Sequence, residues 1–418
     1  MPLTFHKNIL YQILLIACAL VLLVGSYEIT FAVWFLSALI TMRDSYSVAI
    51  LRYLGISLLI MLIAFVTSFS HQYKLYNFFR DIAYLVKPIL GLMLGYQFCR
   101  ILGHKILKTI VYAGVALAIV HILTLLICYV FVGIKDLNTL RHYGGYFDDL
   151  EVYVLVFLLF RKQFDIDISR NRALTFLAIV GFSSFLYFAR TNIIQFFILF
   201  FAMKGYLRLT KRSLAVLTYV AVAVVASYMA IYYSNPKREG QGMEGFLYKI
   251  KIAPIEPFKT KIDKDDWKDF NDNYRSFENI ITVKQVSSGG TRDIIFGKGL
   301  GSTIDLGREV FSNDGEFIRY IPTLHNAYMT VFLKSGLVGV FLLIYFIYLL
   351  FRQRRTNVES IRQINYLLVG SAFFLILSNW VFMGLYLKLD NKSIVLGALI
   401  CYREFLQKQQ RKLVSPNE

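Results

Sequence analysis

The residues best suited to chemistry lie together near position 325. His325 and Asn326 follow Pro322 and Thr323, and a long apolar stretch begins directly after them. Proline and threonine are typical of a helix start, so we expect His325 in the first turn of a helix. The positive end of the helix dipole disfavours the imidazolium there. The pattern indicates a neutral imidazole that can act as a base, and a hydrogen-bonded histidine at a membrane interface is the alternative.

Arginines are the candidates for binding an anionic substrate. Arg190 interrupts an otherwise apolar stretch, and a charge at a membrane boundary is costly enough to indicate a function. Snorkelling of this side chain to the lipid headgroups is the alternative. Arg275 and Arg292 lie in a polar segment, where a solvated loop charge is the alternative for each. Arg141 lies shortly before a Gly-Gly pair and is a further candidate.

Apolar helices must position these residues. Of the 418 residues, 57% are hydrophobic and 17% are charged, whereas an ordinary soluble domain has roughly 25% charged residues. The alternating pattern of a membrane β-barrel is absent, so the backbone must be helical. This composition excludes a soluble enzyme, a disordered chain and a disulfide scaffold. It predicts an all-α polytopic integral membrane protein.

Apolar runs between charged breaks predict how the chain is organised. A spanning helix needs about 20 residues, and the runs correspond to about 12 transmembrane helices, within a range of about 11 to 13. We expect transmembrane helices 1–9 with short loops in residues 1–234, and helices 10–12 with a cytoplasmic tail in residues 326–418. Residues 235–325 would form one large outer-side loop that caps the protein and contains an amphipathic helix over Tyr274–Val286.

The distribution of lysine and arginine predicts the orientation. Basic residues cluster in alternate short connections and in the C-terminal tail, which is the positive-inside pattern of a chain with both termini in the cytoplasm. This pattern explains the formal net charge of +18, so no nucleic-acid partner is expected. In this topology the candidate basic residues all fall on the outer side: Arg141, Arg190, Arg275, Arg292 and His325.

The motif around His325 resembles a known signature. His325-Asn326, followed after nine residues by Gly336-x-x-Gly339, is similar to the signature of the O-antigen ligase and polymerase superfamily, which are bacterial membrane glycosyltransferases of the C-type fold class. The two glycines lie three apart on one helical face and would let another helix approach closely. The predicted architecture, with one large outer loop before the His-Asn helix, is similar to that family as well.

Three further segments resemble arginine positions of this family. They are Ala189-Arg190-Thr191, Tyr274-Arg275-Ser-Phe-Glu278 with the following Gly297-Lys-Gly299-Leu-Gly301, and Arg141 with Gly144-Gly145 and Asp148-Asp149. The first departs from the family pattern by having alanine where serine is usual. Arg292, in a Gly-Gly-Thr-Arg-Asp sequence, is the alternative to Arg275 for the loop position.

The resemblance implies a metal-independent, inverting glycosyltransferase without cofactors in the bacterial inner membrane. Its donor would be an oligosaccharide on polyprenyl (undecaprenyl) diphosphate, and its product an O-antigen or another surface polysaccharide of the cell envelope. Arg190 would stabilise the diphosphate, and His325 would accept the proton of the attacking sugar hydroxyl. The residues implied to bind the donor are Arg275, Arg292, Arg141 and Asn326. Membrane lipids and a chain-length regulator protein are further candidate partners.

The acceptor distinguishes the two activities of this family. A polymerase uses another lipid-linked repeat unit, whereas a ligase uses the lipid A core of lipopolysaccharide. Residues 235–325 contain 14 basic and 14 acidic residues, and a neutral loop is less suited to a polyanionic core, which favours the polymerase. The alternatives of other classes are a lipid-linked oligosaccharide flippase or transporter and a non-catalytic assembly scaffold. No metal is expected, although the Asp148-Asp149 pair is a candidate for an ion.

Overall fold

A computed structural model gives the fold of residues 2–146, 148–208, 210–239, 243–263, 265–311, 317–353 and 356–414. Over these residues the protein is all-α apart from one two-stranded antiparallel hairpin. The helices of the first half are α1 (Pro2–Leu20), α2 (Tyr27–Ile40), α3 (Val48–Ser68), α4 (Leu75–Leu102), α5 (Ile106–Val130), α6 (Leu137–Gly144), α7 (Asp149–Leu159), α8 (Arg170–Leu186), α9 (Arg190–Met203) and α10 (Lys211–Ser234).

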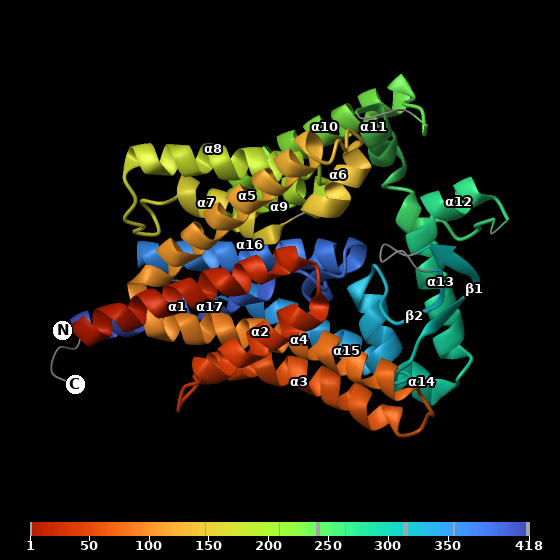
Figure 1. The fold of residues 1–418 in the computed structure, drawn as a ribbon, viewed down its shortest axis with the longest axis horizontal. Coiled ribbons are helices and arrows are strands. Elements are labelled where there is room, and N and C mark those ends of the chain that lie inside the picture. Colours follow the sequence, from red (N-terminus) through yellow and green to blue (C-terminus); the bar gives the residue numbers. More distant parts are fainter. Residues whose placement is uncertain are drawn as a thin grey trace.

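The second half begins with a polar segment of short elements and ends with three long helices. Its elements are α11 (Met243–Ile252), α12 (Trp267–Asp272), α13 (Tyr274–Ser287), α14 (Thr291–Phe296), β1 (Ile304–Phe311), β2 (Phe317–Ile321), α15 (Ala327–Phe351), α16 (Glu359–Val381) and α17 (Lys392–Val414). The elements from α11 to β2, which we call the polar segment, gather at one end of the molecule, whereas α1 begins and α17 ends at the other (Figure 1). The expected amphipathic helix is present as α13.

Five helical segments are long and apolar enough to cross a membrane. They are α3, the unit of α4 and α5 over Leu75–Val130, α10, α15 and α16. Three shorter apolar helices cover Asn8–Val24, Tyr27–Ile40 and Arg190–Met203. The prediction of about twelve spans is therefore wrong for the described residues.

The error has a physical reason, because an apolar run does not dictate the length of the helix that it forms. α7 has only 11 residues, and at about 1.5 Å per residue such a helix rises roughly 16 Å. This is about half of a bilayer core of about 30 Å. A short 3-10 turn over Gly103–Lys105 joins α4 to α5, and the two form one continuous helical unit. Buried apolar runs can thus belong to the protein interior without spanning a membrane.

The packed core lies where α4 runs along α17, with α1, α2, α3, α7 and α16 packed against this pair. Large side chains such as Tyr96, Phe98 and Phe157 are fully buried there. α10 differs from the other long helices, because none of its apolar window is buried inside the protein. Its apolar side chains therefore face the surroundings, as lipid-exposed side chains do.

A break in α15 connects the polar segment to the helical core. Gly336 has φ 64° and ψ −162° in the middle of this helix. The segment that follows α14 lies against the break: the amides of Lys298 and Gly299 donate to the carbonyls of Leu333 and Lys334, at 2.8 and 3.0 Å. The break therefore leaves these two carbonyls paired with a loop in place of the helix.

The predicted close approach of another helix occurs at Gly336 but not at Gly339. A Cβ on Gly336 would lie 2.3 Å from the carbonyl oxygen of Ile295 and 2.5 Å from the Gly297 amide nitrogen. The close partners are therefore the end of α14 and residues 297–301, which we call the glycine segment. A Cβ on Gly339 would meet Ser335 and Val331 of the same helix. The two glycines do not lie on one continuous helical face, because the backbone of α15 is not helical at Gly336.

Replacing Gly336 by alanine is expected to lower the stability of the folded protein. Alanine adopts positive φ only with strain, at a cost of about 1–3 kcal/mol, and its Cβ would overlap backbone atoms of Ile295 and Gly297. Thermal unfolding in detergent should therefore begin at a lower temperature. Gly55→Ala is the matched control, because a Cβ there meets nothing within 4 Å; an equal loss in both variants would contradict this explanation.

Candidate functional site

His325 lies directly before α15 and not in its first turn. Asn326 is the N-cap of the helix, and its side chain accepts a hydrogen bond from the Met329 amide at 3.2 Å. The predicted start at Pro322 and Thr323 is therefore wrong by about one turn, because asparagine caps a helix as well as threonine does. The His325 carbonyl accepts from the Met383 amide at 2.9 Å, which fixes the backbone at this point.

Glu278 of α13 holds the imidazole of His325. The two carboxylate oxygens lie 3.1 and 3.0 Å from His325 Nδ1, and one of them also accepts from the His325 backbone amide at 3.1 Å. The Glu278 side chain is 2% exposed, whereas that of His325 is 46% exposed. A buried acidic group thus supports an imidazole that remains open to a substrate.

Tyr274, one turn before Glu278 on α13, completes the surroundings of the imidazole. Its ring meets that of His325 edge to face, with centroids 5.8 Å apart. Burial, followed by the charge of Glu278, raises the pKa of Tyr274, so its hydroxyl stays protonated. The imidazole is therefore enclosed on one side by α13 and open on the other.

Four cationic side chains from four different helices lie close enough to act on one another's charge. Arg190 at the start of α9 donates to the carbonyl of Lys249 in α11 at 2.6 Å. Desolvation lowers the pKa of Lys249, and the positive charges of Arg141, Arg190 and Arg275 lower it further. We call Arg141, Arg190, Lys249 and Arg275 the cationic cluster. Its members come from α6, α9, α11 and α13, far apart in the sequence but close in space.

One carboxylate offsets part of this charge. Glu256 lies 3.6 Å from Arg275, with both side chains mostly buried, and its charge also acts on Arg190. Arg275 and Glu278 are three residues apart on α13, so they lie on the same side of that helix. The first turn of α13 therefore connects the cationic cluster to the pair of His325 and Glu278.

Two predicted binding residues lie elsewhere or are already engaged. Arg292, at the start of α14, hydrogen-bonds to the hydroxyl of Ser70 beyond the end of α3. It is not one of the positive charges that lower the pKa of Lys249. Asn326 is 2% exposed and uses its side-chain oxygen as the helix cap. Its Nδ2 has no hydrogen-bond partner within the described part of the chain.

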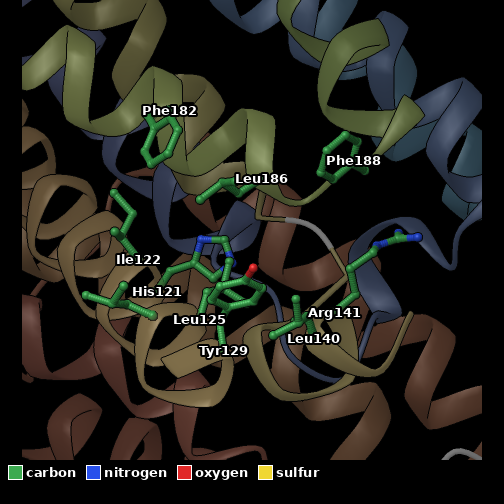
Figure 2. A pocket seen from close by; sticks show the side chains of 11 residues that line it. His121, Ile122, Leu125, Tyr129, Leu140, Arg141, Phe182, Leu186 and Phe188 are labelled. Carbon is green, nitrogen blue, oxygen red and sulfur yellow. The ribbon is translucent and has the colours of Figure 1, made fainter. Parts of the chain in front are cut away.

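A cavity of about 250 Å³ adjoins Arg141. Its walls come mainly from α5, α6 and α8 and are apolar, with His121, Tyr129 and Phe182 among the lining side chains (Figure 2). The Arg141 guanidinium lies at one side of the labelled apolar residues in this view. The cavity can therefore accommodate an apolar chain beside the cationic cluster.

The interior also contains charged and polar pairs that sequence analysis did not single out. Lys392 lies 2.8 Å from Asp149, and both are almost fully buried. Glu151 accepts from Ser183 at 2.8 Å, and Ser183 in turn contacts His121 Nδ1 at 2.8 Å. Asp149 is thus engaged with a lysine, and no group of acidic, histidine or cysteine side chains suited to a metal ion occurs among residues that the structure describes.

Sequence analysis also missed Glu278, Lys249 and Glu256 as members of the site. Glu278 was visible one turn after Arg275 in an amphipathic helix, but its pairing with a histidine 47 residues later has no local sequence signal. Lys249 and Glu256 lie among many other charges of the polar segment. Their relevance follows only from their positions next to the arginines.

No family model, curated protein or solved structure matches this chain. The carboxylate that holds His325 lies three residues from Arg275 on α13, and a base and guanidinium groups brought together by one helix are suited to activating a hydroxyl while stabilising an anionic leaving group.

Proposed function

We propose that this protein is a membrane glycosyltransferase that joins lipid-linked repeat units into a surface polysaccharide. It transfers a glycan from polyprenyl diphosphate to a sugar hydroxyl of another lipid-linked repeat unit. The observation that carries the proposal is the convergence of Arg141, Arg190, Lys249 and Arg275 next to the helix that supports His325. The resemblance of the His325 and arginine motifs to the O-antigen polymerase and ligase superfamily supports the same activity.

The proposed reaction is a single displacement at the anomeric carbon. The acceptor oxygen forms a bond to this carbon and gives its proton to His325, while the bond to the diphosphate oxygen breaks and polyprenyl diphosphate leaves with the electron pair. Arg190 and Arg275 stabilise the negative charge that develops on the leaving group. Guanidinium groups suit this role because they bind phosphate oxygens in a bidentate manner. The displacement inverts the configuration of the anomeric carbon.

The apolar cavity beside Arg141 supports a lipid-linked donor. A polyprenyl chain needs an apolar environment, whereas its diphosphate needs positive charge, and the two are adjacent here. Five helices long and apolar enough to cross a membrane support a membrane location. We propose the bacterial inner membrane, with both termini in the cytoplasm and the site on the outer side. In Figure 1 the site elements and the end of the protein where α1 begins lie at opposite ends.

A reconstituted system tests the proposal. Purified protein in lipid vesicles would receive a polyprenyl-diphosphate-linked oligosaccharide, with either more of the same lipid-linked unit or a lipid A core as the acceptor. We expect glycan ladders and release of polyprenyl diphosphate without the lipid A core. Product formed only with the core would instead identify a ligase. Transbilayer movement of the intact donor without bond formation would identify a flippase, and neither product nor movement would favour a scaffold.

Arg275 and Arg292 provide a direct comparison within the polar segment. Because Arg275 belongs to the cationic cluster and Arg292 contacts Ser70 instead, Arg275→Ala should reduce turnover by about 10-fold or more. Arg292→Ala should leave turnover within about 2-fold of the original, since one exposed hydrogen bond contributes little. The measurement is the rate of polyprenyl diphosphate release at matched protein level. The opposite ranking would assign the donor to Arg292 and contradict the site described above.

A further inference from the structure

We infer that Glu278 is a positioning residue that keeps the proton of neutral His325 on Nδ1 and leaves Nε2 free to accept the proton of the acceptor. The inference rests on the proposed function, because it assigns to His325 the role of base. It concerns a residue to which the sequence alone assigned no role.

The geometry leaves little freedom to the imidazole. Both carboxylate oxygens of Glu278 lie within 3.1 Å of His325 Nδ1. A carboxylate accepts hydrogen bonds but does not donate them, so the ring nitrogen that faces it must carry a proton. In the neutral ring the other nitrogen then has a free lone pair. The His325 side chain is 46% exposed, whereas that of Glu278 is 2% exposed, so the ring is accessible although its partner is buried.

The backbone of His325 also binds the Glu278 carboxylate, so this one side chain holds both the ring and the main chain of the histidine. One oxygen of the same carboxylate also accepts from the His325 amide at 3.1 Å, while the His325 carbonyl is bonded to Met383. The side chain and the main chain of His325 are therefore held by one acidic group and one neighbouring segment. Tyr274, from the same helix as Glu278, limits rotation of the ring from the side.

A glutamine at position 278 would keep the shape of the side chain but change its hydrogen bonds. It offers one acceptor oxygen and one donor amide group, whereas the carboxylate offers two acceptors. If the oxygen pairs with the His325 backbone amide, the amide group faces Nδ1 and favours the tautomer protonated on Nε2. That tautomer cannot accept a proton at the open edge of the ring. Glutamine has nearly the same volume as glutamate, so we expect the variant to keep its fold. Its loss of activity would then come from the changed tautomer of His325.

The first test compares the kinetics of Glu278→Gln with those of Glu239→Gln. Glu239 is an exposed residue of the same polar segment, paired with Lys268 at 2.9 Å, and serves as a matched control. We expect Glu278→Gln to lower kcat by about 10–100-fold, the usual effect of losing a carboxylate that orients a functional histidine. The KM for the donor should change by less than about 2-fold, because Glu278 does not belong to the cationic cluster. The control should retain its kcat.

The second test observes the tautomer without relying on activity. The chain has six histidines, so ¹⁵N NMR of histidine-labelled protein in lipid bilayers at alkaline pH gives few signals, and His325→Ala identifies those of residue 325. We expect the Nδ1-protonated form in the original protein and a gain of the Nε2-protonated form in Glu278→Gln. An Nε2-protonated ring in the original protein would overturn the inference, even if the variant failed to fold.

The two failures can be told apart. If Glu278→Gln keeps a normal kcat while His325→Ala is inactive, the role of Glu278 is disproved and the proposed function stands. If Glu278→Gln loses activity with no change of tautomer, its effect is structural and the inference is also disproved. If His325→Ala turns over normally, the role of His325 as base is wrong, whatever tautomer the NMR spectrum reports.

Discussion

Replacing His325 by alanine is expected to lower the rate of polymer formation by about 10²–10⁴-fold, the usual contribution of a positioned general base. The acceptor hydroxyl would then have to lose its proton to water during the attack. Binding of the donor should change little, because the cationic cluster remains intact. Glycan ladders and released polyprenyl diphosphate, measured at matched protein level, report the rate, and the dependence of that rate on donor concentration reports donor binding.

Stability is not expected to limit this experiment. The His325 side chain is 46% exposed, so its removal leaves no large internal cavity. The Asn326 cap of α15 is unaffected, and the buried carboxylate of Glu278 keeps its hydrogen bond from the backbone amide of residue 325. His104→Ala is a suitable control, because His104 lies in the turn between α4 and α5 and contacts Gln409 of α17. Full-length polymer from His325→Ala would end the assignment of this histidine as the base.

Replacing Arg190 by alanine is expected to lower turnover by about 10²–10³-fold, comparable to removing one donor from a preorganised anion site. Arg190 begins α9 and is anchored by its bond to the Lys249 carbonyl at 2.6 Å. Its remaining donors can face an anionic leaving group. Arg190→Lys should recover only a small part of the loss, because lysine keeps the charge but not the planar fork that pairs with two phosphate oxygens.

The comparison of lysine with alanine separates charge from geometry. Arg172→Lys, at an exposed position near the start of α8, controls for the loss of an arginine outside the cluster. Each variant is assayed for donor turnover in vesicles of the same lipid composition. Near-normal turnover of Arg190→Lys would exclude a bidentate phosphate contact, and near-normal turnover of Arg190→Ala would remove this residue from the site.

The class of fold could be predicted from composition, but the number of spans could not. The low charge and the long apolar runs required helices, and α15 and α16 lie close to the predicted late spans. Apolar residues also fill the interior of a large helical protein, so short helices such as α7 carry the same signal as a span. The amphipathic pattern of α13 was more informative, since one of its faces packs on the polar segment and on α15.

The site could be predicted only in part, for a related reason. Residue type and local context singled out His325 and Arg190, because a histidine at a helix end and a charge in an apolar run are both unusual. The choice between Arg275 and Arg292 required the fold, since both are ordinary charges in a polar segment. Glu278 and Lys249 became relevant through contacts that join distant segments.

The glycine segment donates hydrogen bonds to carbonyls of α15, so we expect that this protein cannot be divided into fragments that fold independently. Without residues 297–301, the broken turn at Gly336 would have two acceptors with no donor in an apolar environment, each at a cost of several kcal/mol. Conversely, a fragment made of the polar segment alone would expose amides that now reach Leu333, Lys334 and Ala64. Secretion or expression of that segment as an independent module should therefore give an unfolded product, and the polar segment should acquire its shape only together with the helices that surround it.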